Sequence, residues 1–299
     1  MNLLVTGAWS GAKEYIPALE KMGHAVAFMQ YETDELPCSG DWVEGVVCNG
    51  LFLHHAIESF PNLRCIQLTS AGFDRVPMDF VRANGIEIRN ARGVYSAPMA
   101  EYAISGVLQL YKQAAFFREN QKRRRWEKHR GLRELSGKTV CIVGCGSVGS
   151  ECAKRFQAFG CRVIGIATEK REQAFFDEVR PVAELDNVLP EADVVVLCVP
   201  LTGRSTGLMN ADRIAQMKHD AVLVNISRGA IADEAALTEA LRKGCIGGAV
   251  LDVFEDEPLN EESPLWNTEN VIVTPHNSFV GEGNGTRLTE VILEQLMKS

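Results

Sequence analysis

Two consecutive series of short, β-branched apolar runs, separated by amphipathic stretches, constrain the fold of this chain more than any other feature. In the first series the runs cover residues 2–7, 24–29, 45–49, 63–70 and 85–90. In the second series they cover residues 138–144, 161–168, 193–200, 221–227, 246–253 and 270–275. Nearly continuous apolar strands that alternate with helices are typical of parallel sheets covered on both faces. The pattern predicts an α/β protein with two doubly wound parallel-sheet domains.

The chain length of 299 residues also fits two domains. We expect one domain to comprise residues 1–97 and 281–299, and a second domain, residues 98–280, to be inserted in it. A long helix is predicted from Pro98 to Glu127, because proline suits a first helical turn and apolar residues recur every three or four positions. A last helix is predicted over residues 286–297.

Composition narrows the function classes. Hydrophobic residues make up 46% and charged residues 23% of the chain, which indicates a globular protein. The net charge of −8 argues against nucleic acid or an anionic membrane as the main partner, and the basic run at residues 122–125 is interpreted as a solvated helix face. We expect neither a signal peptide nor a spanning helix, which needs about 18 apolar residues. Nine cysteines without a CxxC pair favour buried thiols in the cytoplasm and no metal site.

A glycine pattern at the start of the second series predicts a dinucleotide site. Gly144, Gly146 and Gly149 form G-x-G-x-x-G between the strand KTVCIVG and the helix SECAKRFQAFG. The first glycine permits a tight turn, the second lets a pyrophosphate approach the backbone, and the third lets helix and strand pack closely. Ser147 and Val148 open the helix whose N-terminus faces the phosphates.

Two further features are interpreted as structural. Cys145 occupies the variable position of the glycine loop and is interpreted as a small neutral residue, with an oxidant-sensitive thiol as the alternative. The turn TGAWSGA at residues 6–12 resembles a short-chain dehydrogenase turn, but Lys13 replaces its last glycine and the chain has no YxxxK pair. We therefore expect this turn to be structural.

The end of the next strand bears on which nicotinamide cofactor binds. An Asp or Glu usually stands there and binds the ribose hydroxyls of NAD. This sequence has Ala167 at that place, followed by Thr168, Lys170 and Arg171. A missing carboxylate beside two cations favours the 2′-phosphate of NADP. We therefore favour NADP, with NAD as the alternative if Glu169 turns inward.

Seven stretches, in this order, resemble the D-isomer-specific 2-hydroxyacid dehydrogenase family over nearly the whole chain. They are LTSAGFDRV, YSAPMAEYA, GKTVCIVGCGSVG, CVPLTGRSTGLMN, LVNISRGAIADEAALTEAL, GGAVLDVFEDEPL and NVIVTPH. The resemblance implies an NAD(P)-dependent oxidoreductase that transfers hydride between nicotinamide and a small 2-oxo or 2-hydroxy acid. It also implies a Rossmann cofactor domain at residues 98–280, inserted in a flavodoxin-like substrate domain, with the active site in a cleft that closes between them.

The resemblance assigns catalysis to Arg228, Glu257 and His276, and their chemistry fits the reaction. The planar cation of Arg228 suits a carboxylate and a ketone. His276 suits proton delivery to the ketone oxygen, and Glu257 would orient the imidazole and favour its protonated form. The frame D-x-F-x-x-E-P selects Glu257 over Glu255 and Asp256. A structural ion pair for Arg228, a solvated acid at Glu257 and an ordinary strand-end histidine are the alternatives.

By the same resemblance, further contacts fall at motif positions. Backbone N–H groups of Ser70, Ala71 and Gly72 are expected to bind the substrate carboxylate. Asp252 is expected to bind the nicotinamide amide. Other cofactor contacts are expected at Val199, Pro200, Thr206, Ile226 and Ser227.

Substrate and partner follow from the finer resemblance. TSAGFDRV resembles glyoxylate and hydroxypyruvate reductases, so we favour that substrate pair. The alternatives are a phosphoglycerate-type dehydrogenase, with Arg75 and Arg92 as candidate phosphate ligands, and a non-metabolic NAD(H)-sensing corepressor-like protein. Glu257 argues against a formate dehydrogenase, which pairs the histidine with Gln. The helix after Pro98 resembles the family's dimerisation arm, so we expect a homodimer.

Overall fold

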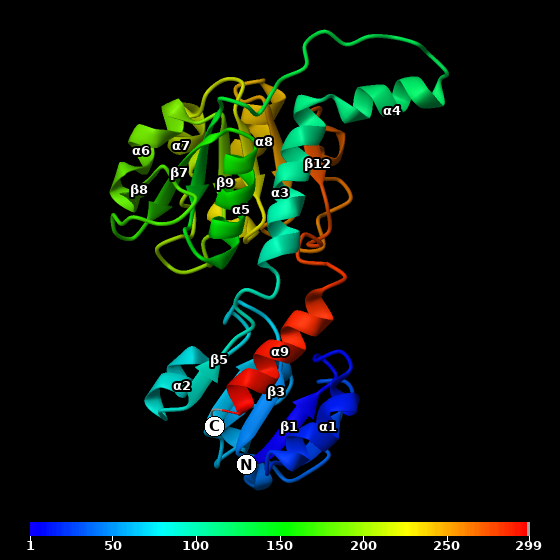
Figure 1. Ribbon diagram of the computed structural model, residues 1–299, viewed down its shortest axis with the longest axis vertical. Helices are drawn as coiled ribbons and strands as arrows, with labels where there is room; N and C mark the ends of the chain where they lie inside the picture. Colours follow the sequence, from blue (N-terminus) through cyan, green and yellow to red (C-terminus); the bar gives the residue numbers. More distant parts are fainter. Residues whose placement is uncertain (298–299) are drawn as a thin grey trace. The chain divides into compact units, whose positions relative to one another are not determined.

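The chain forms two compact units in the computed structural model, which describes residues 1–297 (Figure 1). Unit 1 comprises Met1–Tyr95 and the chain from Gly281 onward, and unit 2 comprises Ser96–Val280. Each unit is built on one parallel sheet. The predicted fold class is therefore confirmed.

The sheet of unit 1 has the strand order β2-β1-β3-β4-β5, and neighbouring strands are parallel throughout. This is the flavodoxin-like order. Its strands are β1 (Asn2–Thr6), β2 (Ala25–Met29), β3 (Gly45–Cys48), β4 (Cys65–Leu68) and β5 (Glu87–Arg89). Its helices are α1 (Ala12–Lys21), α2 (Met78–Ala83) and α9 (Asn284–Leu296). The strands predicted from the first series are all present.

Side chains of unit 1 alternate between the two faces of its sheet. Leu3 of β1 packs in a core with residues of α1 and α9, whereas Leu4 packs in a separate core on the opposite face. Trp9 is fully buried, and its indole Nε1 donates to Thr289 Oγ1 of α9 at 3.0 Å. The turn at residues 6–12 therefore has the structural role expected of it, because it ties the last helix to the sheet.

The sheet of unit 2 has the strand order β12-β11-β10-β9-β6-β7-β8, again parallel throughout. Counted from β6 this is the Rossmann order, with one strand added beyond β11. Its strands are β6 (Thr139–Val143), β7 (Arg162–Ala167), β8 (Glu178–Pro181), β9 (Val194–Leu197), β10 (Val222–Asn225), β11 (Gly248–Leu251) and β12 (Val271–Val273). Its helices are α3 (Ser96–Tyr111), α4 (Ala114–Lys122), α5 (Ser147–Ala158), α6 (Leu185–Val188), α7 (Ala211–Gln216) and α8 (Glu234–Arg242).

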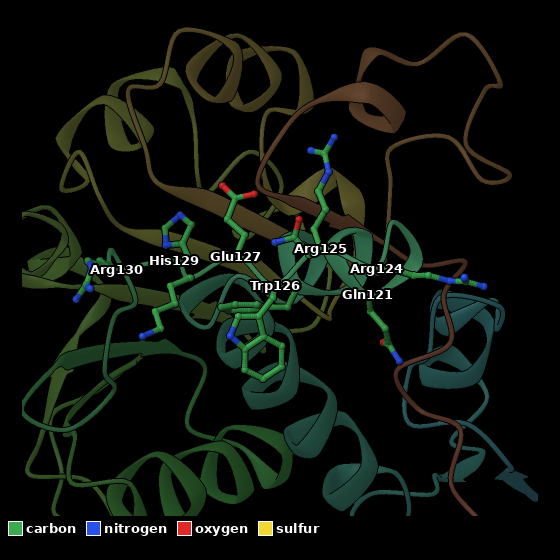
Figure 2. Close-up of a pocket in the computed structure, with 10 residues that line it drawn as sticks. Gln121, Arg124, Arg125, Trp126, Glu127, His129 and Arg130 are labelled. Carbon is green, nitrogen blue, oxygen red and sulfur yellow. The ribbon is translucent and has the colours of Figure 1, made fainter.

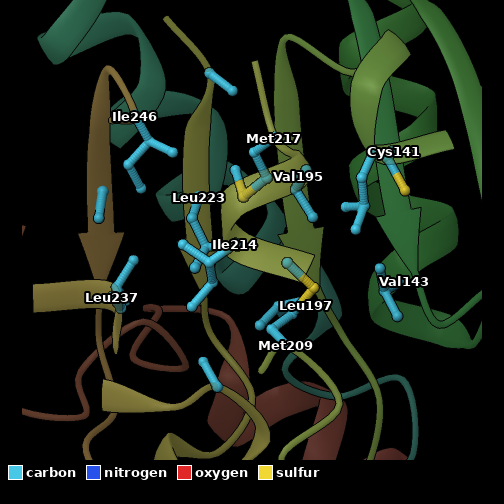
Figure 3. Close-up of a cluster of buried hydrophobic side chains, with 14 of the residues drawn as sticks. Cys141, Val143, Val195, Leu197, Met209, Ile214, Met217, Leu223, Leu237 and Ile246 are labelled. Carbon is cyan, nitrogen blue, oxygen red and sulfur yellow. The ribbon is translucent and has the colours of Figure 1, made fainter. Parts of the chain in front are cut away.

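Helices cover both faces of this second sheet. Residues of α3 and α5 share one core with the strands, and residues of α6, α7 and α8 share the other. Figure 3 shows part of the core that contains α6, α7 and α8, with Ile214 of α7, Leu237 of α8 and Leu223 of β10 among its residues. Because both faces are covered, loops at the carboxyl edge of the sheet are the natural place for a site.

Strand β8 was not predicted from the sequence. Its four residues, EVRP, include a Glu178–Arg180 ion pair at 2.8 Å, and Val179 is the buried residue among them. A charged edge strand lacks the apolar run that identifies a buried strand.

The single helix predicted from Pro98 to Glu127 is wrong. The structure has α3 and α4 instead, with Gln113 in the left-handed region at φ 53° between them. The buried residues of α3 continue to Tyr111, whereas Asn120 is the buried residue of α4. The chain bends where the apolar face ends, and Figure 1 shows α4 running away from the sheet of unit 2.

Candidate active site

The three glycines of the loop between β6 and α5 meet three different steric demands. Gly144 has φ 104°, and a Cβ there would lie 2.8 Å from the carbonyl carbon of Cys198. At Gly149 a Cβ would lie 1.9 Å from the carbonyl oxygen of Gly144. At Gly146 no heavy atom of the described chain lies within 4 Å of an added Cβ. Two glycines are thus required by packing, and the middle one borders open space.

That open space lies at the start of α5. Gly146 is the N-cap residue, and no side chain among residues 1–297 caps the helix, so the first N–H groups, beginning at Ser147 and Val148, can bind an external acceptor. An uncapped helix N-terminus binds anions through N–H groups and the helix dipole. The residues present therefore fit a dinucleotide pyrophosphate.

Burial makes Cys145 an unreactive thiol. Its side chain is 6% exposed and donates to the carbonyl of Ile166 at 3.6 Å. Burial raises the pKa of the Cys145 thiol to about 11, with nearby Arg171 opposing the shift. A neutral thiol at pH 7 agrees with the interpretation as a small filler and argues against the oxidant sensor.

A bridge joins the loop after β7 to the glycine loop. Arg171 donates from Nη2 to the carbonyl of Cys145 at 3.1 Å and from Nε to Gln173 Oε1 at 2.9 Å. Gln173 Nε2 in turn donates to the same carbonyl at 2.9 Å and to Ser150 Oγ at 2.8 Å. Arg171 is therefore held beside the glycine loop although it is exposed. Thr168 and Lys170 are exposed as well. Gln173 was missed because no motif contains it.

The loops after β9 and β10 hold the other predicted cofactor residues. Ser227 Oγ donates to the carbonyl of Val199, which ties the two loops together. Ser205 Oγ donates to the carbonyl of Pro200 at 2.6 Å, and Thr206 Oγ1 donates to the carbonyl of Thr202 at 2.9 Å. Ile226 is 1% exposed and belongs to the core of unit 2, so its side chain has a packing role.

Arg228 follows β10 in an extended conformation, and its Nη1 donates to the carbonyl of Ser227 at 2.7 Å. The next residue has no room for a side chain. A Cβ at Gly229 would lie 1.8 Å from the carbonyl carbon of Phe254 and 2.3 Å from the nitrogen of Glu255. This backbone contact joins the loop of Arg228 to the loop that carries Glu257.

Glu257 and His276 form a hydrogen-bonded pair. His276 Nδ1 lies 2.8 Å from Glu257 Oε2, and the other carboxylate oxygen accepts from the N–H of Phe254 at 3.2 Å. An ionised carboxylate only accepts hydrogen bonds, so Nδ1 carries the proton of this pair and Nε2 is the nitrogen left for a ligand. Both side chains are about one-third exposed, 35% for His276 and 36% for Glu257.

The carboxylate of Asp252 holds the loop of His276. Asp252 is 0% exposed, and its Oδ1 accepts from Thr274 Oγ1 at 2.6 Å and from the N–H of Asn277 at 2.7 Å. Its Oδ2 accepts from the N–H of Ser278 at 2.8 Å, and its backbone carbonyl accepts from the N–H of His276 at 2.8 Å. From the sequence, Asp252 was predicted to contact the cofactor. These hydrogen bonds were not predicted, because their partners lie 22 to 26 residues further along the chain and leave no local pattern.

In unit 1, the turn at Ser70–Gly72 follows β4 at the carboxyl edge of the sheet. The carbonyl of Ser70 accepts from the N–H of Ala91 at 2.9 Å, and the carbonyl of Ala71 accepts from Asn90 Nδ2 at 2.7 Å. The carbonyl of Gly72 accepts from Ser70 Oγ at 3.2 Å. These hydrogen bonds hold the conformation of the turn within unit 1.

Two further features of residues 1–297 concern metal ions and membranes. No cluster of three or more His, Cys, Asp or Glu side chains in this range could hold a metal ion. None of the helices in the same range has the length and apolar character of a membrane span.

Known proteins are similar to this chain in sequence and in fold. Residues 104–278 match the family model for the D-isomer specific 2-hydroxyacid dehydrogenase NAD binding domain. The glyoxylate reductase of Thermofilum pendens is 34% identical over 249 residues, which are 81% of this chain and 73% of that protein. A D-isomer specific 2-hydroxyacid dehydrogenase family protein from Aeromonas salmonicida aligns with a TM-score of 0.85 and 31% identity over 98% of this chain and 93% of its own. A D-isomer specific 2-hydroxyacid dehydrogenase from Xanthobacter autotrophicus, in complex with NADPH and MES, aligns with a TM-score of 0.80 and 27% identity over 99% and 94% of the two chains.

The family model spans more than half of this chain, and its range contains the glycine loop, Arg228 and the Glu257–His276 pair. The chain therefore belongs to the D-isomer specific 2-hydroxyacid dehydrogenase family and is a nicotinamide-dependent oxidoreductase for small 2-hydroxy and 2-oxo acids.

Proposed function

We propose that this protein reduces a small 2-oxo acid of the glyoxylate or hydroxypyruvate type, and that Arg228, Glu257 and His276 carry the reaction. The observation that supports this most is the 2.8 Å hydrogen bond between His276 and Glu257. The loop that carries Glu257 packs against Gly229, the residue after Arg228. A phosphoglycerate-type dehydrogenase and an NAD(H)-sensing corepressor-like protein are the competing candidates. Arg75, one of the cations that a phosphate group would need, instead donates to Asn49 Oδ1 at 3.0 Å.

In this proposal Arg228, Glu257 and His276 form a catalytic triad, and each has a separate task. Bound nicotinamide supplies the hydride. Arg228 holds the substrate carboxylate and polarises its ketone. Nε2 of His276 delivers a proton to the ketone oxygen, while Glu257 orients the ring and stabilises the imidazolium. The residues that hold the cofactor are those of the glycine loop and the loops after β7, β9 and β10.

The preference for NADP is supported by the position of Arg171. The residue at the end of β7, Ala167, has no carboxylate to bind ribose hydroxyls or repel a phosphate. Two hydrogen bonds, to Gln173 and to the carbonyl of Cys145, hold the Arg171 guanidinium beside the glycine loop. A fixed guanidinium recognises a phosphate better than a mobile one, because less side-chain entropy is lost on binding.

Residues 112–133, which include α4, form a segment that we call the arm. The positive charge of the arm supports a homodimer that forms through it. The arm contains nine lysines and arginines against two glutamates, whereas the whole chain has a net charge of −8. The arm borders an open hollow of about 830 Å³, lined in part by Arg124, Arg125 and Trp126, and Trp126 is 98% exposed (Figure 2). A basic, partly aromatic arm on an acidic protein suits the acidic surface of a second copy.

The triad generates the first prediction. With NADPH and a panel of 2-oxo acids that includes 3-phosphohydroxypyruvate, glyoxylate or hydroxypyruvate should give the highest kcat/KM. His276→Ala should lower kcat by about 100- to 10,000-fold, the range for losing a general acid. Asp256→Asn, which changes an acidic neighbour of Glu257, should leave kcat unchanged. Full kcat in His276→Ala would rule out the proton-donor role, and no turnover of any 2-oxo acid would favour the sensor.

The glycine loop generates the second prediction, with two matched variants. Gly146→Ala places a methyl group in open space, so the melting temperature should be unchanged while the Kd for NADPH rises by about tenfold or more through steric exclusion. Gly149→Ala places a methyl group against the carbonyl of Gly144 and should lower the melting temperature of the cofactor-free protein. Isothermal titration and thermal unfolding measure both effects. Unchanged NADPH affinity in Gly146→Ala would refute this placement of the pyrophosphate.

The bridge to the glycine loop generates the third prediction. Arg171→Ala should lower kcat/KM for NADPH by about tenfold, the equivalent of one charge-assisted contact, and should leave the value for NADH nearly unchanged. Lys243→Ala, which removes a cation at the end of α8, serves as the control. A parent enzyme that prefers NADH would contradict the NADP assignment itself.

The arm generates the fourth prediction. Sedimentation velocity at micromolar concentration should show a dimer, and the double variant Arg124→Glu/Arg125→Glu should shift the protein toward monomer by charge repulsion. Lys21→Glu, an exposed change on α1, should not alter the sedimentation coefficient. A monomeric parent protein would exclude the arm-mediated homodimer.

A further inference from the structure

A chain of partly buried hydrogen bonds runs from α3 to the loop of His276. Tyr102 OH lies 2.5 Å from Thr274 Oγ1, and Thr274 Oγ1 donates to Asp252 Oδ1 at 2.6 Å. Tyr102 belongs to α3, Thr274 follows β12 and Asp252 follows β11. Three elements thus meet at one carboxylate, and Thr274 lies two residues before His276 in the sequence.

The direction of this chain is fixed by proton counting. A threonine hydroxyl has one proton, and Thr274 uses it toward Asp252. The Tyr102 hydroxyl must therefore donate to Thr274 Oγ1. Burial raises the pKa of Tyr102 above its ordinary value, so its hydroxyl keeps the proton that this bond requires at neutral pH.

The packing of α3 brings Tyr102 to this place. A Cβ at Gly106 would lie 2.5 Å from Val250 Cγ1 of β11, so the helix lies directly on the strand there. A Cβ at Gly248, the start of the same strand, would lie 3.2 Å from Leu110 Cδ1. The helix therefore runs antiparallel to β11, and Tyr102, one turn before Gly106, reaches the strand's carboxyl end.

The loop that receives these bonds has a demanding conformation. His276 has φ 50°, in the left-handed region that a residue with a Cβ adopts only when its surroundings hold it. Its N–H and those of Asn277 and Ser278 all donate to Asp252. A rotation of the Asp252 carboxylate would break the hydrogen bonds to Asn277 and Ser278, the two residues that follow His276.

We propose that Tyr102 and Thr274 are positioning residues for the reaction: by fixing the Asp252 carboxylate, they hold His276 in the geometry in which Nδ1 meets Glu257 and Nε2 meets the substrate. This inference rests on the proposed role of His276 as proton donor. Neither residue belongs to the triad, and their effect on the reaction is transmitted through Asp252. Displacement of a catalytic group by about 1 Å is enough to lower a rate by about 100-fold.

Steady-state kinetics of three variants test the proposal. Tyr102→Phe removes one hydrogen bond and should lower kcat by roughly five- to tenfold. Thr274→Val removes both bonds of the hydroxyl and should lower kcat by about 30- to 100-fold, whereas Thr274→Ser keeps the hydroxyl and should retain most of kcat. In all three, KM for the 2-oxo acid should stay within about twofold, because the groups proposed to bind the substrate carboxylate are unchanged.

Two controls separate this inference from a general structural effect and from the proposed function. Tyr111→Phe removes another buried hydroxyl from α3, one that accepts from Arg133 Nη2 at 3.1 Å, and should leave kcat unchanged. Equal losses of kcat in Tyr102→Phe and Tyr111→Phe would overturn the positioning role. Full kcat in Tyr102→Phe and Thr274→Val beside an inactive His276→Ala would overturn it while leaving the proton-donor role intact. Full kcat in His276→Ala would overturn both.

Discussion

The buried carboxylate of Asp252 is the interaction on which the candidate catalytic loop depends. It lies at the end of β11 with no exposed surface, and it accepts hydrogen bonds from Thr274, Asn277 and Ser278. A carboxylate in such a place is stable only when its oxygens are hydrogen-bonded. The chain after β12 supplies those donors, so the cost of burying Asp252 and the conformation of the loop are linked.

Close backbone contacts at two glycines hold the other loops of the site in place. Gly149 packs on the carbonyl of Gly144, and Gly229 packs on the backbone between Phe254 and Glu255. In both places an added Cβ would lie within 2 Å of a backbone atom, which no side-chain rotation relieves. The first contact sets α5 against β6 for an anion at the helix N-terminus, and the second joins the loops of Arg228 and Glu257. Glycine at these two positions is a requirement of packing.

How far the sequence predicts this structure depends on whether a feature is local. The buried strands and the glycine loop were predictable, because their periodicity or spacing lies within one short segment. Strand β8 and the bend at Gln113 were not, since a charged edge strand has no apolar run and the end of an amphipathic face is gradual. The roles of Gln173 and Tyr102 depend on partners in other elements, and Tyr102 meets Thr274 across 172 residues. Such contacts follow from the packing of α3 on β11 and from no single segment.

Magnitudes indicate that the loop of His276 is held firmly enough to be pre-organised. A non-glycine residue in the left-handed region costs on the order of 1–3 kcal/mol. Hydrogen bonds to a charged group contribute about 1.5–3 kcal/mol each, and the Asp252 carboxylate accepts three of them, one from Thr274 and two from backbone N–H groups after His276. These hydrogen bonds oppose the strain and favour the left-handed turn before any ligand binds. A proton donor held in this way needs little reorganisation in the transition state, which is where fixed hydrogen-bonding groups accelerate a reaction most.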